Sequence, residues 1–96
     1  KKYSTLKTKP QELDKFKNKN IFLTIDLDVL DPSLMSGVGT PEAGGLSYNE
    51  LVDWLKYLKN FNIVSADIME LSPDIDPTKT STATACKLVR EVLNLL

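Results

Sequence analysis

The stretch Ile21-Phe22-Leu23-Thr24-Ile25-Asp26-Leu27-Asp28 (residues 21–28) decides the fold, because it is an apolar run that ends in two acids. Apolar residues occupy both faces of this run, which is typical of a parallel strand buried between two layers. Asp26 and Asp28 are one residue apart, so in a continued strand their side chains would point to the same face. Two carboxylates held this close repel each other, and a divalent cation relieves the repulsion. The stretch therefore predicts a strand, Ile21–Asp26, that leads into a metal site.

The rest of the chain alternates helical and strand patterns. Ser47 and Glu50 have the spacing of a capping box, and the apolar residues after them predict a helix from Tyr48 to about Lys59. Asn62–Glu70 has the composition of a second strand. The last segment predicts a helix started by Asp76-Pro77, with a packed face made of Ala83, Ala85, Leu88, Val89, Val92 and Leu93. A short helix is also expected near Pro10–Phe16.

This order of elements predicts a βαβ unit with parallel strands, followed by one more helix. Two parallel strands form a marginal sheet by themselves, and the chain has only 96 residues. We therefore expect an α/β protein of three-layer α/β/α architecture with a parallel sheet. Residues 1–96 would supply only the C-terminal βαβα part of its single domain.

Composition excludes several classes of protein. The net charge is −1, and the lysines among the first nineteen residues are interrupted by Glu12 and Asp14, which indicates a solvated face rather than a nucleic-acid site. No apolar run approaches the roughly 20 residues that span a membrane, and no signal-peptide pattern is present. Cys86 is the single cysteine, which fits a reducing compartment. The expected location is the cytoplasm.

A long loop follows the first strand. It opens with Asp31-Pro32 and ends with Gly44-Gly45, and it contains all four glycines of the chain. Such a concentration of glycine beyond the carboxyl end of a strand indicates a shaped, functional loop.

Both predicted strands end in acids. Because ligands of open parallel sheets bind beyond the carboxyl ends of the strands, Asp26, Asp28 and Glu70 are expected to converge there. An all-oxygen set suits Mg²⁺ or Mn²⁺. The alternative is that Asp28 and Asp31 only shape the turn and that Glu70 is solvated.

A longer pattern carries a family resemblance. It reads Leu-Thr-Ile-Asp-Leu-Asp-Val-Leu-Asp-Pro-Ser at residues 23–33 and Gly-Val-Gly-Thr-Pro-Glu-Ala-Gly-Gly-Leu-Ser at residues 37–47. This pattern closely resembles the third metal motif of the ureohydrolases, the family of arginase and agmatinase. Ala-Asp-Ile-Met-Glu-Leu-Ser-Pro at residues 66–73 resembles the next strand of that family. The sequence Thr-Pro-Glu followed by Gly-Gly looks more like agmatinase than arginase.

The resemblance implies hydrolysis of a small guanidino compound, with agmatine first, to an amine and urea, a step of polyamine biosynthesis. It implies two Mn²⁺ ions, with Asp26 bridging them and Asp28 binding one. It also implies that Glu70 pairs with the substrate guanidinium, that Thr40 borders the substrate, and that the complete enzyme is a homo-oligomer. The histidine-bearing metal motifs of the family have no counterpart, because the chain contains no histidine. The 96-residue chain by itself is therefore expected to be inactive.

Two other functions stay open at this point. A phosphohydrolase of the haloacid dehalogenase type also places Asp-x-Asp after an apolar strand, and Asp26 would then be a nucleophile. Against it, that family continues with Gly-Thr, whereas this chain continues with Val29-Leu30-Asp31-Pro32. The other alternative is a remnant without activity that binds a partner through an exposed apolar face of its sheet.

Overall fold

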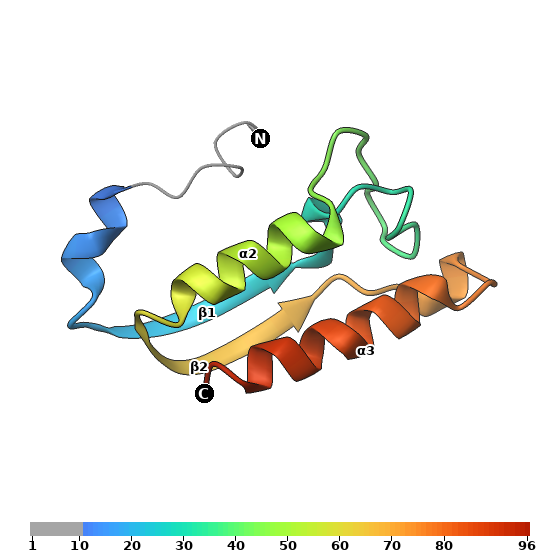
Figure 1. The fold of residues 1–96 in the computed structure, drawn as a ribbon. Helices are drawn as coiled ribbons and strands as arrows, with labels where there is room; N and C mark the ends of the chain where they lie inside the picture. Colours follow the sequence, from blue (N-terminus) through green and yellow to red (C-terminus); the bar gives the residue numbers. More distant parts are fainter. Residues whose placement is uncertain (1–10) are drawn as a thin grey trace.

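The computed structural model of the chain describes residues 11–96. Its elements are a 3₁₀ helix, Gln11–Phe16, then strand β1, Asn20–Asp26, helix α2, Tyr48–Leu58, strand β2, Asn62–Met69, and helix α3, Thr80–Leu93 (Figure 1). The predicted order is confirmed, and the bounds of both strands and of α2 differ from the predicted ones by one residue at most. Pro10, expected in the first turn of the short helix, lies outside the described residues, as do Lys1, Lys2, Lys7 and Lys9.

The two strands pair in parallel, as predicted. Asn20 pairs with Asn62 at one end, and Asp26 pairs with Met69 at the other. The register shifts after Ile21, where β2 contains one extra residue, Val64. Beyond this irregularity the Thr24 hydroxyl donates a hydrogen bond to the Asp67 carboxylate, its partner in the register. These contacts fix the relative height at which the two strands end.

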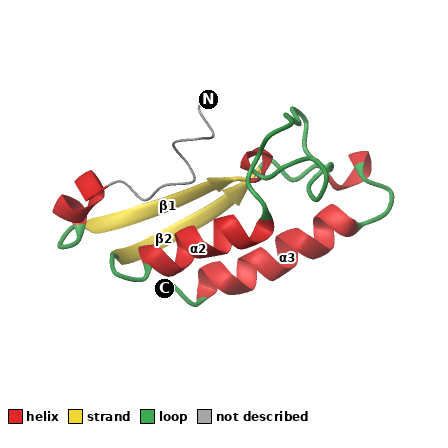
Figure 2. Ribbon diagram, turned by 45° about the horizontal axis from the view of Figure 1, so that its top comes forward, coloured by secondary structure: helices red, strands yellow, loops and turns green. Residues whose placement is uncertain are grey.

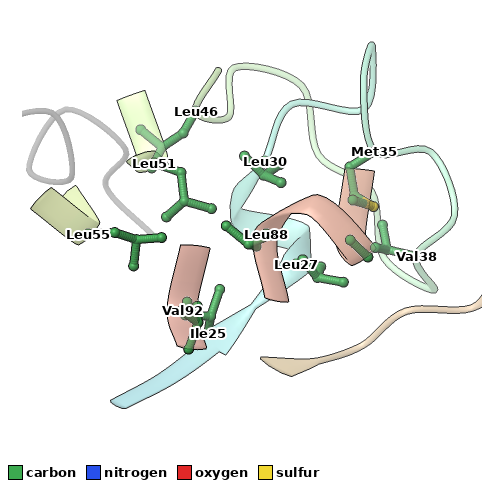
Figure 3. Close-up of a cluster of buried hydrophobic side chains, with 11 residues drawn as sticks. Ile25, Leu27, Leu30, Met35, Val38, Leu46, Leu51, Leu55, Leu88 and Val92 are labelled. Atoms are coloured by element: carbon green, nitrogen blue, oxygen red, sulfur yellow. The ribbon is translucent and has the colours of Figure 1, made fainter. Parts of the chain in front are cut away.

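Helices α2 and α3 both pack on one face of the sheet, as Figure 2 shows. Leu51 and Leu55 of α2 and Leu88 of α3 share one apolar core with Ile25 of β1 (Figure 3). The long loop adds buried side chains to the same core, namely Leu30, Met35, Val38 and Leu46. The loop is therefore held by its own apolar residues, which agrees with the prediction of a shaped loop.

Among residues 11–96, no element covers the opposite face of the sheet. Phe22 is 59% exposed and Val64 is 55% exposed, so β1 is not buried between two layers of the described residues. The prediction of a strand buried on both faces is wrong for the chain taken alone, because both of its long helices lie on the same side. Val89 and Leu93, expected on the packed face of α3, are 42% and 60% exposed for a similar reason, because no other element of the described residues covers them.

Local signals explain how α2 begins and correct the expected start of α3. The Ser47 hydroxyl accepts a hydrogen bond from the Glu50 amide at 3.1 Å, and the Glu50 carboxylate accepts one from the Ser47 amide at 2.9 Å, which confirms the capping box. Helix α3 begins at Thr80, so Pro77 lies outside its first turn. Among the described residues, no helix is long and apolar enough to cross a membrane.

Candidate functional site

Asp26 ends β1 and starts a tight turn. Residues Leu27–Val29 form a short 3₁₀ turn, and the Asp26 carboxylate accepts a hydrogen bond from the Asp28 amide at 3.0 Å. Asp28 therefore lies outside the strand, and the alternation of a strand does not orient its side chain. The expected strand geometry is wrong at this residue, because an aspartate that caps its own turn competes with continued strand structure.

Asp28 and Thr40 lie together although they are 12 residues apart in the sequence. The Thr40 hydroxyl donates a hydrogen bond to Asp28 Oδ2 at 3.1 Å. Thr40 is exposed, and Asp28 is half-buried. The long loop thus returns over the end of β1 and places a hydroxyl against one of the two predicted metal ligands.

Asp31 closes the long loop on itself. Its carboxylate accepts hydrogen bonds from the Gly44 and Gly45 amides at 2.9 and 3.2 Å, and from the Ser33 amide at 3.0 Å. Hydrogen bonds from the Ser33 hydroxyl, the Ser33 amide and the Gly44 amide lower the pKa of Asp31 from 3.8 to about 2. Its carboxylate therefore stays ionised and holds the entry and the exit of the loop together.

The exit of the loop also requires glycine at residue 45. The Leu46 amide donates to the Val29 carbonyl at 2.8 Å, and the Asp31 amide donates to the Leu46 carbonyl at 2.9 Å. A Cβ added to Gly45 would lie 2.6 Å from the Asp31 nitrogen. Only a residue without a side chain permits the two backbone segments to approach this closely.

Glu70 follows β2 directly and is exposed. Since Asp26 pairs with Met69, Glu70 is the first residue beyond the level at which β1 ends. Its φ is 78°, a left-handed conformation that residues with a side chain rarely adopt. Such a backbone at the end of a strand turns the side chain away from the direction that strand alternation would give it.

The donor set fits part of a metal centre. Asp26 and Asp28 supply carboxylate oxygens, which hard divalent ions prefer. Within residues 11–96, no three acidic, histidine or cysteine side chains gather into a group that could hold a metal ion. The expected convergence of Asp26, Asp28 and Glu70 into one ligand group is therefore not found. Asp26 and Asp28 thus stay predicted metal ligands that lie next to each other at the end of β1.

Comparison with known proteins identifies the relatives of this arrangement. A model of the arginase family matches residues 2–94. The agmatinase of Halalkalibacterium halodurans is 41% identical over 83 residues, which are 84% of this chain and 29% of that protein. The arginase structure from Bacillus subtilis is 37% identical with a TM-score of 0.76, over 84% of this chain and 30% of that one. Proclavaminate amidino hydrolase from Streptomyces clavuligerus is 30% identical with a TM-score of 0.81, over 86% of this chain and 28% of that one.

These matches cover most of this chain and less than a third of each of these three relatives. The α/β fold of the arginase type is thus confirmed, and residues 1–96 hold only a part of it. The loop with its Asp-Pro and Gly-Gly ends and the strand before Glu70 lie within the matched residues. By its sequence and by its structure, the chain belongs to the arginase family.

Proposed function

We propose that these residues form part of a Mn²⁺-dependent hydrolase that converts a guanidino compound, with agmatine as the first candidate, to an amine and urea. One observation carries the proposal. Asp26, Asp28 and Thr40 are joined by hydrogen bonds at the end of β1, and β2 ends at the same level just before Glu70, in a chain of the arginase family. The names of the relatives support the agmatine candidate, because the agmatinase of Halalkalibacterium halodurans is one of them.

Each side chain has a separate role in the proposal. Asp26 and Asp28 hold the metal ions, and bound ions of this kind lower the pKa of water so that it becomes a nucleophile at neutral pH. Thr40 borders the guanidino substrate, and its hydroxyl also donates a hydrogen bond to Asp28 Oδ2. Glu70 accepts two N–H groups of the guanidinium, a geometry that a carboxylate matches well. Substrate and metal are thus assigned to different residues.

The remaining parts of the proposal concern the complete protein. Residues 1–96 would be the C-terminal segment of a single ureohydrolase domain, and the histidine ligands would come from outside these residues, which contain none. The complete enzyme would be a homo-oligomer in the cytoplasm. The single cysteine of the chain, Cys86, is an exposed free thiol.

Membership of the arginase family argues against the phosphohydrolase alternative. In addition, the Asp26 carboxylate accepts the Asp28 amide and caps a turn, which is a restraint on a side chain that would have to attack phosphorus. The partner-binding remnant has one observation in its favour, the open sheet face with Phe22 and Val64. An incomplete domain would expose the same face, so this observation does not separate the two proposals.

The first test is the open reading frame that encodes Lys1. We expect histidine-bearing metal motifs upstream of it, and the product of that frame is called the full-length protein below. A frame without such motifs would favour the partner-binding remnant.

The second test is the replacement Asp26→Asn in the full-length protein. It should remove at least one bound Mn²⁺ and lower urea release by orders of magnitude, because a negatively charged residue that would hold the metal is lost. The matched control is Asp53→Asn, which changes an exposed acid of α2. Equal manganese content and equal urea release in the two variants would contradict the proposal.

A further inference from the structure

A chain of buried hydrogen bonds links the long loop to the start of α3. Ser81 is fully buried, and Asp76 is 5% exposed. The Ser81 hydroxyl donates to Asp76 Oδ2 at 2.7 Å and accepts from the Gly37 amide at 2.8 Å. Because the one hydroxyl proton of Ser81 points to the carboxylate, its lone pairs are directed toward the loop. The negative charge of the Asp76 carboxylate strengthens the hydrogen bond that it accepts from the Ser81 hydroxyl.

Asp76 is itself held firmly. Its Oδ2 also accepts the Ser81 amide at 2.9 Å, and its Oδ1 accepts the Thr78 amide at 3.0 Å. Hydrogen bonds from Thr78 and Ser81 hold the pKa of this carboxyl well below its usual range. Asp76 therefore orients the Ser81 hydroxyl and satisfies an amide in the first turn of α3 at the same time.

Gly37 makes hydrogen bonds through both its amide and its carbonyl. Its amide donates to Ser81, and its carbonyl accepts the Ser72 amide at 2.7 Å. A Cβ added to Gly37 would lie 2.8 Å from the Ser81 Cβ, so the loop approaches α3 more closely than a side chain would permit. Gly37 precedes Thr40 by three residues, and Ser72 follows Glu70 by two. The two contacts therefore tie the segment of Thr40 to the segment of Glu70.

We propose that Ser81, oriented by Asp76, is a positioning residue that fixes the loop of Thr40 relative to Glu70 and thereby sets the substrate side of the site. This inference rests on the proposed function, in which Thr40 and Glu70 face the guanidino substrate. The Gly37 contacts do not involve Asp26 or Asp28. The Thr40 segment reaches the proposed metal ligands through a hydrogen bond to Asp28 Oδ2, which leaves the Asp26 carboxylate and the turn of residues 27–29 in place. Loss of the Ser81 hydroxyl should therefore affect substrate binding and leave metal binding intact.

The test uses two variants of the full-length protein. Ser81→Ala leaves the buried Gly37 amide without its acceptor, while Asp76 still accepts the backbone amides of residues 78 and 81, so the start of α3 is kept. Gly37→Ala acts from the loop side, because an added Cβ would lie 2.8 Å from the Ser81 Cβ and 3.3 Å from the Asp76 Cβ and would push the loop away from both residues. Both should raise KM for the guanidino substrate by about tenfold to a hundredfold, since small displacements of positioning groups have effects of that size. The manganese content should equal that of the wild type.

A control variant and a hydrogen-exchange measurement, which needs no catalysis, separate the positioning role of Ser81 from a purely structural role. Ser36→Ala makes the same change in an exposed serine of the same loop and should keep the wild-type KM. Amide hydrogen exchange at residue 37 should be faster by about tenfold or more in Ser81→Ala than in Ser36→Ala, because a protecting hydrogen bond is lost.

The outcomes are distinct. A wild-type KM in both Ser81→Ala and Gly37→Ala would overturn the positioning role while the proposed function stands. Loss of manganese from Ser81→Ala would also overturn it, because the hydroxyl would then support the metal ligands. A wild-type protein without Mn²⁺-dependent urea release would contradict the proposed function itself.

Discussion

Glu70 keeps a side chain in a backbone conformation that favours glycine. Its φ of 78° carries a cost of about 1–3 kcal/mol for a residue of this kind. The Glu70 side chain is exposed, so packing does not explain a carboxylate at this position. Strained residues of this type cluster at sites that act on ligands. The backbone at Glu70 thus supports the proposal that its carboxylate meets the substrate.

The replacement Glu70→Gln in the full-length protein tests that proposal. Glutamine keeps the shape but has one acceptor oxygen, and its amide donors would face the donors of the guanidinium. Loss of a charge-assisted pair of roughly 1.5–3 kcal/mol should lower kcat/KM by about tenfold to a hundredfold. The manganese content should stay at the wild-type value, because Glu70 is assigned to substrate and not to metal. Metal analysis beside urea-release kinetics on agmatine, arginine and guanidinobutyrate gives the answer.

Two results would speak against this assignment. Stoichiometric loss of manganese would make Glu70 a metal ligand. Unchanged kinetics on every guanidino substrate would place the carboxylate outside the site.

At the scale of elements, the long loop depends on one carboxylate. Asp31 accepts hydrogen bonds from the amides of Ser33, Gly44 and Gly45, so it joins residues that are 13 and 14 positions away to the entry of the loop. Its pKa is lowered from 3.8 to about 2 in the folded chain. A carboxyl whose folded pKa lies below its unfolded pKa stabilises the fold above the unfolded value, and this contribution is lost as the pH falls through the folded value.

Acid should therefore weaken the chain between about pH 4 and pH 2, and the variant Asp31→Asn should show a flatter profile over this range. The side-chain NH₂ group of asparagine is a hydrogen-bond donor, and it would face at least one of the backbone amides that donate to Asp31. The variant should therefore be less stable near neutral pH. The free energy of unfolding, measured by denaturant titration at several pH values, checks both expectations. Asp53→Asn, the same change on the exposed side of α2, should follow the wild-type curve. An equally steep profile in Asp31→Asn would show that other groups carry the acid dependence.

The elements differ in how far the sequence determines them. The strands and α2 follow from local signals, such as the capping box of Ser47 and Glu50, and these were predicted within one residue. The loop geometry depends on contacts between distant residues, for example Gly37 with Ser81, 44 positions away. No periodicity or short motif reports such a contact. The residue types of the site could thus be predicted, but not the turn that separates Asp28 from β1, nor the role of Ser81.

At the scale of the whole molecule, the described residues cover the sheet on one face only. The prediction of a strand buried on both faces describes the complete arginase-type fold, and less than a third of that fold is present. An apolar groove of about 300 Å³ also lies between β1 and α2, with Leu23, Trp54 and Leu58 among its lining residues. In the two-stranded sheet that the structure describes, β2 pairs with one side of β1, and β2 adds no residue to this groove. The groove therefore lies where the remainder of a parallel sheet would pack.

A chain with an open sheet face and an unpaired strand edge should associate with itself. Exposed strand edges and apolar patches are the usual sites of such association. We expect the average mass of the 96-residue chain in light scattering to rise with concentration, and Phe22→Lys to reduce this rise by placing a charge on the open face. Ile75→Lys is the matched control, because Ile75 is 54% exposed in the turn before α3 and lies outside the sheet. Equal association of Phe22→Lys and Ile75→Lys would place the contact elsewhere on the chain. A wild-type chain that stays monomeric at every concentration would contradict the expected self-association.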